Sequence, residues 1–345
     1  MDKLFFGKTS KGIDAYKYSI ANTNGMKVVF TDMGAAVVEI WVKDANGQLL
    51  DVALGYDDVQ QYEKEGTYFG AIVGRYANRI AGAKYEIDGV EYLLEANNNE
   101  NNLHSGPNGL AREVWQVAEH TENKIVFTCV TKDDGFPGTA ECRVTYEVTE
   151  ENALVISYLA TPDAKSPFNM TNHSYFNLNG HESGTILDHE LMIKASAYTP
   201  VKDDKAIPTG EIAPVENTPF DFRVAKLIGR DIEEDFEQLI FGQGYDHNFA
   251  LDKETDGVEK IATAYSAESG IVMDVFTDCI GVQLYTANFV DGDLGKNGHN
   301  YVRRGGFCLE TQYFPNSINE PNFVRPVTEA GENYETQTIY KFSVK

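Results

Sequence analysis

Six short segments of this chain combine hydrogen-bonding side chains with aromatic rings, a mixture that suits the binding of a neutral polyol. They are 74–80 (GRYANRI), 102–106 (NLHSG), 171–178 (TNHSYFNL), 245–248 (YDHN), 281–285 (GVQLY) and 309–315 (LETQYFP). No signature of a Ser or Cys nucleophile accompanies them. The chemistry that remains is proton transfer, for which a Glu and a His are suitable partners.

Familiar cofactor and metal motifs are incomplete in this sequence. The GKT at 7–9 lacks the earlier glycine of a phosphate-binding loop, and no GxGxxG follows a predicted strand. The HE at 181–182 has no second His four residues after the first, and 291–297 lacks the sixth-place glycine and the closing Glu of a calcium loop. We therefore expect catalysis without a cofactor and no metal in the site. A structural Ca²⁺ or Na⁺ stays open, because no set of ligands can be named.

The elements that must position these segments are predicted to be strands. Apolar and polar residues alternate with a period of two in 141–148 (ECRVTYEV), as in a half-buried strand. In 84–94, Asp88-Gly89 stands between two β-prone runs and predicts a hairpin turn. Further strands are predicted at 26–31, 35–43, 124–130, 153–161, 271–277, 280–286 and 336–344.

Helical signals are few, at 57–65 and near 231–239. Neither is long enough to connect parallel strands repeatedly, so the pattern predicts an all-β fold, a large antiparallel β-sandwich with few short helices. We expect a single domain over residues 1–345. The Pro- and Asp-rich stretch 199–223 is predicted to be an ordered excursion over the sheet, anchored by Ile207, Ile212, Val215, Phe220 and Phe222.

Charge and cysteine content restrict the function further. The chain of 345 residues has 53 Asp and Glu against 29 Lys and Arg, a formal net charge of −24, which disfavours binding to nucleic acid or to anionic membranes. The four cysteines show no metal-ligand spacing and are expected to be small buried hydrophobic residues. No stretch is long and apolar enough for a membrane span, so we expect a cytoplasmic protein, with a removed signal peptide left open. The sequence leaves monomer and homodimer open.

In this order and at these spacings, the six segments resemble the aldose 1-epimerase (galactose mutarotase) family, from about residue 5 to residue 345. The resemblance implies a β-supersandwich and an isomerase that interconverts the α and β anomers of free hexoses without a cofactor. It implies that His173 is the general acid and Glu310 the general base. The implied sugar-binding residues are Asn78, Arg79, His104, Asp246 and Gln283.

Two features of the matched segments leave alternatives. Arg75 lies four residues before Arg79, and we favour Arg79 as the sugar ligand because it follows Asn78 in the matched motif. Tyr76 and Tyr313 depart from the residues expected at their positions and could change substrate preference.

The implied mechanism requires His173 to be protonated when it acts as the general acid. Opening a hemiacetal ring requires removal of a proton from the C1 hydroxyl and delivery of one to the ring oxygen, so His173 must be cationic near neutral pH. We expect a nearby carboxylate to raise the pKa of His173 above its ordinary value of about 6.5. Activity should then fall at low pH as Glu310 gains a proton and at high pH as His173 loses one.

Three other functions compete with this one. A glycoside hydrolase would need a second catalytic carboxyl near Glu310, for which Asp246 is the obvious candidate. A lectin-like module would bind sugar without turnover. An epimerase of hexose 6-phosphates would need a cluster of Arg or Lys for the phosphate, which the sequence does not show. The preference for glucose or galactose is left open, since it can depend on a single side chain.

Overall fold

The computed structural model describes residues 3–64 and 66–345, and strands dominate it. The largest sheet has nine strands in the order β11-β12-β13-β14-β29-β23-β22-β17-β20. Along the chain these strands are β11 (Gln116–His120), β12 (Lys124–Thr131), β13 (Ala140–Val148), β14 (Ala153–Pro162), β17 (His189–Ile193), β20 (Lys226–Leu227), β22 (Glu259–Ser266), β23 (Ile271–Thr277) and β29 (Tyr334–Val344). Every neighbouring pair in this sheet is antiparallel.

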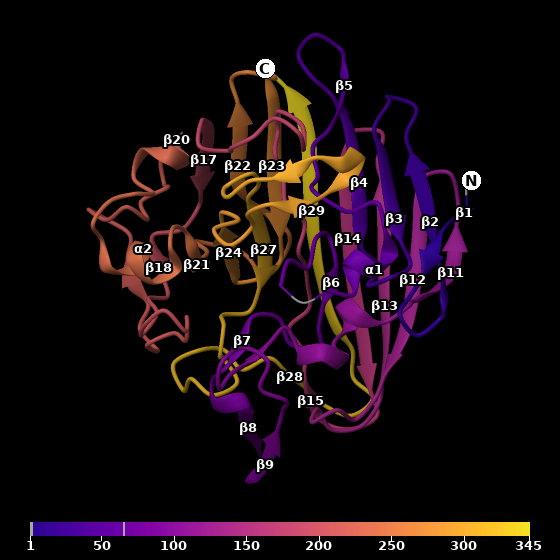
Figure 1. The fold of residues 1–345 in the computed structure, drawn as a ribbon. Helices are drawn as coiled ribbons and strands as arrows, with labels where there is room; N and C mark the ends of the chain where they lie inside the picture. Colours follow the sequence, from indigo (N-terminus) through magenta and orange to yellow (C-terminus); the bar gives the residue numbers. More distant parts are fainter. Residues whose placement is uncertain (1–2, 65) are drawn as a thin grey trace.

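Two five-stranded antiparallel sheets accompany it. The first, in indigo in Figure 1, runs in sequence order through β1 (Lys3–Lys8), β2 (Asp14–Ala21), β3 (Lys27–Thr31), β4 (Val37–Lys43) and β5 (Leu49–Asp51). The second has the order β19-β18-β21-β24-β27, made of β18 (Ala197–Tyr198), β19 (Ala213–Pro214), β21 (Asp246–Ala250), β24 (Gly281–Tyr285) and β27 (Cys308–Gln312).

Two-stranded ribbons and short helices complete the described fold. The ribbons pair β6 (Ile72–Val73) with β16 (Thr171–Asn172), β7 (Arg79–Ile80) with β10 (Asn102–Leu103), β8 (Lys84–Ile87) with β9 (Val90–Leu93), β15 (Ser166–Pro167) with β28 (Val327–Thr328), and β25 (Asp293–Leu294) with β26 (Asn300–Tyr301). The helices are α1 (Val59–Tyr62), α2 (Glu237–Gly242) and the 3₁₀ turns Ala81–Ala83, Gly106–Asn108, Leu110–Arg112, Ile228–Arg230 and Lys296–Gly298. The all-β prediction is confirmed.

One continuous core joins the three sheets. Val28 of the first five-stranded sheet, Val144 and Tyr340 of the nine-stranded sheet, and Phe249 and Leu309 of the second five-stranded sheet all belong to the same buried cluster. Both smaller sheets therefore bury one face together with the nine-stranded sheet (Figure 1). Burial of this apolar area is the main stabilising contribution to such a sandwich.

Local patterns behave as the sequence predicts. In β13 the even-numbered residues from Cys142 to Val148 are buried and Glu141 and Arg143 are exposed. The β8–β9 hairpin turns at Asp88 (φ 53°) and Gly89 (φ 80°), the pair of positive φ angles that a tight two-residue turn requires. This hairpin projects from the body of the protein at the bottom of Figure 1.

The helix predictions are right in kind and wrong in extent. The helix expected at 57–65 covers only Val59–Tyr62, where the Asp58 side chain caps the Gln60 amide, and residue 65 lies outside the described residues. The helix expected near 231–239 begins only at Glu237. The segment before it is held as a turn because the Asp231 carboxylate accepts hydrogen bonds from the Lys226 ammonium and the Arg230 guanidinium.

The excursion at 199–223 is ordered, but one predicted anchor is wrong. Ile207, Val215, Phe220 and Phe222 are buried, whereas Ile212, in the irregular segment directly before β19, is 47% exposed. Of the cysteines, Cys129 is only partly buried and the other three are buried, and all four are free thiols. Among the described residues, no helix combines the length and the apolar character that crossing a membrane requires.

Candidate active site

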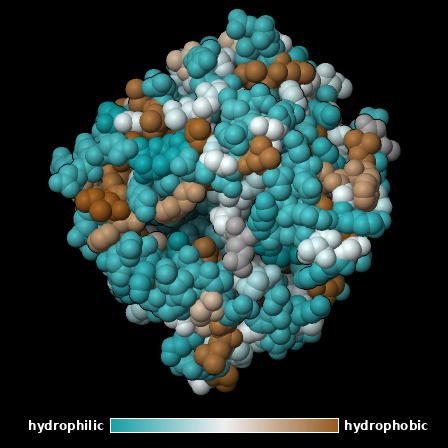
Figure 2. Space-filling model, in the orientation of Figure 1, coloured by the Kyte–Doolittle hydropathy of each residue, from teal (hydrophilic) through white to brown (hydrophobic). Residues whose placement is uncertain are grey.

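A cavity of about 310 Å³ lies where the second five-stranded sheet meets the loops of the small ribbons. Figure 2 shows it as a hollow near the middle of the face that is turned to the viewer. Its lining combines charged, amide and aromatic side chains, as a polyol site requires. The lining residues are Gly66, Tyr68, Asn78, Arg79, Asn98, Asn99, Leu103, His104, His173, Tyr175, Asp204, Asp246, Tyr285, Phe289 and Glu310.

One face of the second five-stranded sheet forms the floor of this site. Since side chains alternate along a strand, Phe249 and Leu309 enter the core while Asp246, Gln283 and Glu310 point to the opposite face. In the ladder Gln283 lies directly opposite Glu310. The pairing of three strands thus gathers acidic and amide groups that are far apart in the sequence.

The ribbon of β7 and β10 supplies the next group. The His104 amide donates to the Asn78 carbonyl oxygen (3.0 Å), and the Asn78 amide donates in return to Nδ1 of His104 (3.1 Å). Because Nδ1 accepts, the proton of the neutral imidazole is on Nε2, which can donate to a ligand. Both residues have left-handed backbone conformations, with φ of 61° and 55°, as strained residues at functional sites often do.

His173 comes from the ribbon of β6 and β16. Its amide donates to the Ala71 carbonyl (2.9 Å), which continues the pairing of the ribbon by one residue. The imidazole is stacked against the Tyr175 ring, with centroids 5.0 Å apart and planes 14° apart, and lies nearly parallel to the Tyr68 ring at 6.0 Å. These rings fix the plane of the imidazole, so that its nitrogens face fixed directions.

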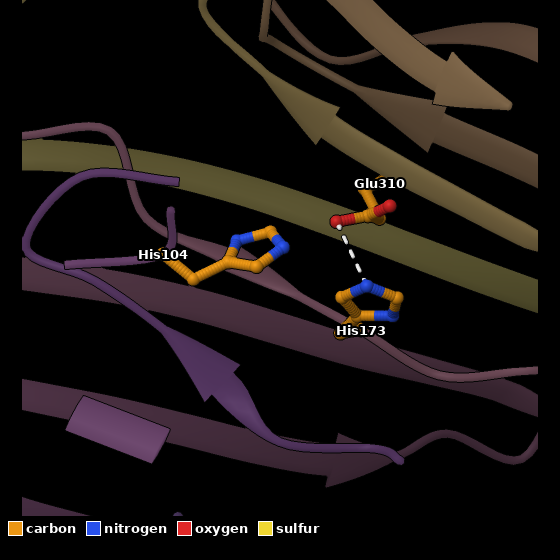
Figure 3. Close-up of side chains that lie close together, drawn as sticks. All are labelled: His104, His173 and Glu310. Carbon is orange, nitrogen blue, oxygen red and sulfur yellow. Dashed lines mark ion pairs between the residues drawn. The ribbon is translucent and has the colours of Figure 1, made fainter. Parts of the chain in front are cut away.

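His104, His173 and Glu310 converge on one point, as Figure 3 shows. Nε2 of His173 lies 3.7 Å from Oε2 of Glu310, and Glu310 is only 2% exposed. Oε2 of Glu310 has no hydrogen-bond partner among the described residues. A buried carboxyl oxygen without a partner is costly, and a hydroxyl group of a bound ligand would satisfy it.

Burial changes the proton affinities of this pair, and the expectation for His173 is wrong. Burial lowers the pKa of His173 to about 4 instead of raising it. Burial, together with the negative charge of Asp246, raises the pKa of Glu310 well above its ordinary value, against a smaller opposing effect of Arg79. Burial of both groups thus favours the uncharged pair, a protonated Glu310 and a neutral His173, over the ion pair.

The two arginines of the GRYANRI segment have separate roles. Arg75 is buried and its guanidinium donates to the Thr131 and Ser166 hydroxyl groups and to three backbone carbonyl oxygens. Arg79 lines the cavity, and its Nε donates to Oδ1 of Asn98 (3.0 Å). The geometry therefore favours Arg79 as the sugar ligand, as the sequence suggested.

Gln283 is hydrogen-bonded to Asp246 on the sheet face that forms the floor of the site. Its Nε2 donates to Oδ1 of Asp246 (2.7 Å), and the residue is not among those that line the cavity. The structure thus places Gln283 where it orients Asp246, and its role as a direct sugar ligand stays a prediction. Asp246 itself faces the cavity, and burial raises its pKa against the opposing effects of Arg79 and of the Gln283 hydrogen bond.

The three convergent side chains also have the composition of a metal-binding set. His104, His173 and Glu310 each offer a ligand atom, all within 4.8 Å of one another. A metal-binding His normally donates a hydrogen bond from its other ring nitrogen. His104 does the reverse, because Nδ1 accepts from the Asn78 amide and leaves Nε2 protonated. The set therefore suits a sugar hydroxyl better than a cation.

Several lining residues are absent from the predicted set. Tyr175 and Tyr285 lie within the segments singled out in the sequence, but their rings were given no role. Tyr68, Asn98 and Phe289 lie outside those segments, and nothing in the local sequence marks them. Only the folded arrangement brings them to the cavity.

Comparison with known proteins decides the family. The family model for aldose 1-epimerase matches residues 16–341. The chain belongs to the aldose 1-epimerase family. It is 39% identical to the galactose mutarotase of Homo sapiens over 345 residues, which cover 99% of this chain and 98% of that protein. It is 35% identical to the aldose 1-epimerase of Escherichia coli (strain K12) over 328 residues, 94% of each.

Solved structures of this family share the fold. A GalM/aldose epimerase homologue from C. elegans superposes with a TM-score of 0.88 at 31% identity, over 96% of this chain and 99% of that one. A galactose 1-epimerase from Lactobacillus acidophilus gives a TM-score of 0.86 at 24% identity, over 99% and 98% of the two chains. The predicted fold, a sandwich like that of galactose mutarotase, is confirmed.

Proposed function

We propose that this aldose 1-epimerase interconverts the α and β anomers of free hexoses, galactose and glucose, by opening and reclosing the hemiacetal ring. The observation that carries the proposal is that Nε2 of His173 lies 3.7 Å from Oε2 of Glu310 in a cavity lined by charged, amide and aromatic side chains. The family membership supports the isomerase activity. Catalysis needs no cofactor in this proposal, and a cytoplasmic location stays a prediction.

The reaction needs one base and one acid, and this pair supplies both. Transfer of the Glu310 proton to Nε2 of His173 gives a carboxylate and an imidazolium. The carboxylate then removes the proton of the C1 hydroxyl while the imidazolium protonates the ring oxygen, and the C1–O5 bond breaks to leave an open-chain aldehyde. Rotation about C1–C2 presents the other face of the aldehyde. Reclosure reverses both transfers, so no proton is gained or lost.

Burial of the pair favours this cycle. Ring opening returns the pair to a protonated Glu310 and a neutral His173, the uncharged forms that burial favours. Because buried charges are costly, the imidazolium is a stronger acid and the carboxylate a stronger base here than in water, and both become neutral as the ring opens. Arg79, Asp246 and the Nε2–H of His104 are placed to hold the other hydroxyl groups during rotation.

Polarimetry of freshly dissolved α-D-galactose and α-D-glucose tests the proposal. Wild-type protein should accelerate the decay of rotation, and Glu310→Gln and His173→Asn should each remove the acceleration. The same samples should release no aryl alcohol from aryl glycosides. Release of aryl alcohol would support the hydrolase alternative, and sugar binding without any acceleration would support a binding module.

A further inference from the structure

Cys308 lies on the side of His173 opposite to Glu310. It is fully buried on β27, two residues before Glu310, so that both side chains point to the same face of the sheet. Its Sγ is 3.5 Å from Nδ1 of His173, within hydrogen-bond distance for sulfur, while Nε2 of the same ring faces Glu310. The imidazole therefore lies between a thiol and a carboxyl group that come from one strand.

This arrangement bears on which nitrogen of the neutral ring holds the proton. Nε2 can take a proton from Glu310 only if it carries a lone pair, and the ring proton must then be on Nδ1. The Cys308 sulfur is the side-chain atom within hydrogen-bond distance of Nδ1 among residues 3–64 and 66–345, and the ring also interacts with the backbone of His173 itself. The other titratable neighbours of the ring are in aromatic contact with it: Tyr68, His104, Tyr175 and Tyr285.

We propose that Cys308 is a positioning residue for the epimerase reaction: its sulfur accepts the Nδ1–H of His173 and so holds the neutral ring in the tautomer whose Nε2 can exchange a proton. The proposal rests on the proposed function and assigns Cys308 a role that acts through His173. Catalytic triads orient a His in the same way but with an Asp, whose negative charge stabilises the imidazolium. A neutral thiol orients the ring without that charge. Burial, with repulsion from Glu310 and Asp246, raises the pKa of the Cys308 thiol well above its ordinary value, so it stays neutral.

The first test reads the tautomer directly, without sugar. Nitrogen-15 NMR of uniformly labelled protein distinguishes the Nδ1–H from the Nε2–H tautomer, and His173→Asn identifies the signals of His173. The wild type should show the Nδ1–H form, and Cys308→Ala should show a substantial population of the Nε2–H form. Cys308→Ser keeps a hydroxyl acceptor and should lie between them. Cys142→Ala removes a buried thiol that does not line the cavity and should match the wild type.

The second test separates positioning from binding and folding. Loss of one modest hydrogen bond should lower kcat about tenfold in Cys308→Ala with KM within about twofold, and Cys308→Ser should recover part of the loss. An unchanged tautomer in both Cys308 variants, or an equal loss with no recovery in the serine variant, would overturn the proposal. If the wild type does not accelerate mutarotation, the proposed function fails, whereas the NMR result still decides the contact between Cys308 and His173.

Discussion

Replacing Glu310 with Gln should remove most of the activity and at the same time stabilise the protein at neutral pH. The substitution keeps the size of the side chain and removes the titratable group that is proposed to exchange a proton with His173, whose Nε2 lies 3.7 Å from Oε2 of Glu310. General acid–base catalysis by one positioned group contributes about 10²- to 10⁴-fold, and kcat should fall by that factor. Because Glu310 and His173 act as a unit, the double variant with His173→Asn should be little worse than either single variant.

The gain in stability follows from the burial of Glu310. Its pKa is raised in the folded protein, so its contribution to stability is largest below the ordinary carboxyl pKa of 4.5 and is lost as the pH rises toward the folded pKa. Gln is uncharged in the folded and the unfolded chain and avoids this pH-dependent penalty; at about 1.4 kcal/mol for each pH unit by which the pKa is raised, roughly one to two pH units correspond to about 1–3 kcal/mol. For 345 residues, an unfolding entropy of about 2.1 cal/mol/K per residue converts this to a rise in Tm of about 1–4 °C.

Differential scanning calorimetry at pH 7 and at pH 4, with polarimetry on the same samples, checks both parts. The rise in Tm should be present at pH 7 and should shrink at pH 4, where the carboxyl group is protonated in the folded and the unfolded chain. Glu141→Gln, at an exposed position of β13, is the matched control and should change neither quantity. More than a tenth of wild-type kcat in Glu310→Gln, or a lower Tm at pH 7, would refute the reasoning.

Three further predictions follow from the same geometry. The rate of mutarotation plotted against pH should be bell-shaped. It should fall near pH 4, where His173 is protonated while Glu310 also holds its proton, and again at alkaline pH, where Glu310 loses its proton at a raised pKa. A decline in rate centred at pH 6.5 would contradict this assignment of the two pKa values. Arg79→Met should raise KM about 10- to 100-fold and leave Tm nearly unchanged. Arg75→Met should lower Tm by about 4 °C or more, because it leaves buried hydrogen-bond acceptors unpaired. Kinetics and calorimetry together therefore separate the roles of the two arginines. Gln283→Leu should raise KM about five- to tenfold by releasing Asp246, and an isothermal titration that shows unchanged sugar affinity would count against that positioning role.

Local sequence predicts the elements of this fold well where one side of the element is buried. β13 and the Asp88-Gly89 hairpin are examples, since alternation and turn chemistry are properties of a few adjacent residues. Elements stabilised by distant contacts are predicted less well. The ribbon of β6 and β16 is an example, because its two segments lie far apart in the sequence. The late start of α2 has a local cause, because Asp231 is engaged by Lys226 and by the adjacent Arg230.

The sequence by itself determined which residue types are available for the chemistry, and the resemblance of the quoted segments to the aldose 1-epimerase family named His173 and Glu310 as its candidates. The tertiary structure decided how those residues behave. It joins Gln283 to Asp246 by a hydrogen bond, brings Tyr68 and Phe289 to the cavity, and places the Cys308 sulfur within hydrogen-bond distance of His173. It also reverses the expected shift of the His173 pKa, because the penalty for burying a charge depends on everything that surrounds the group and not on its neighbours in the sequence.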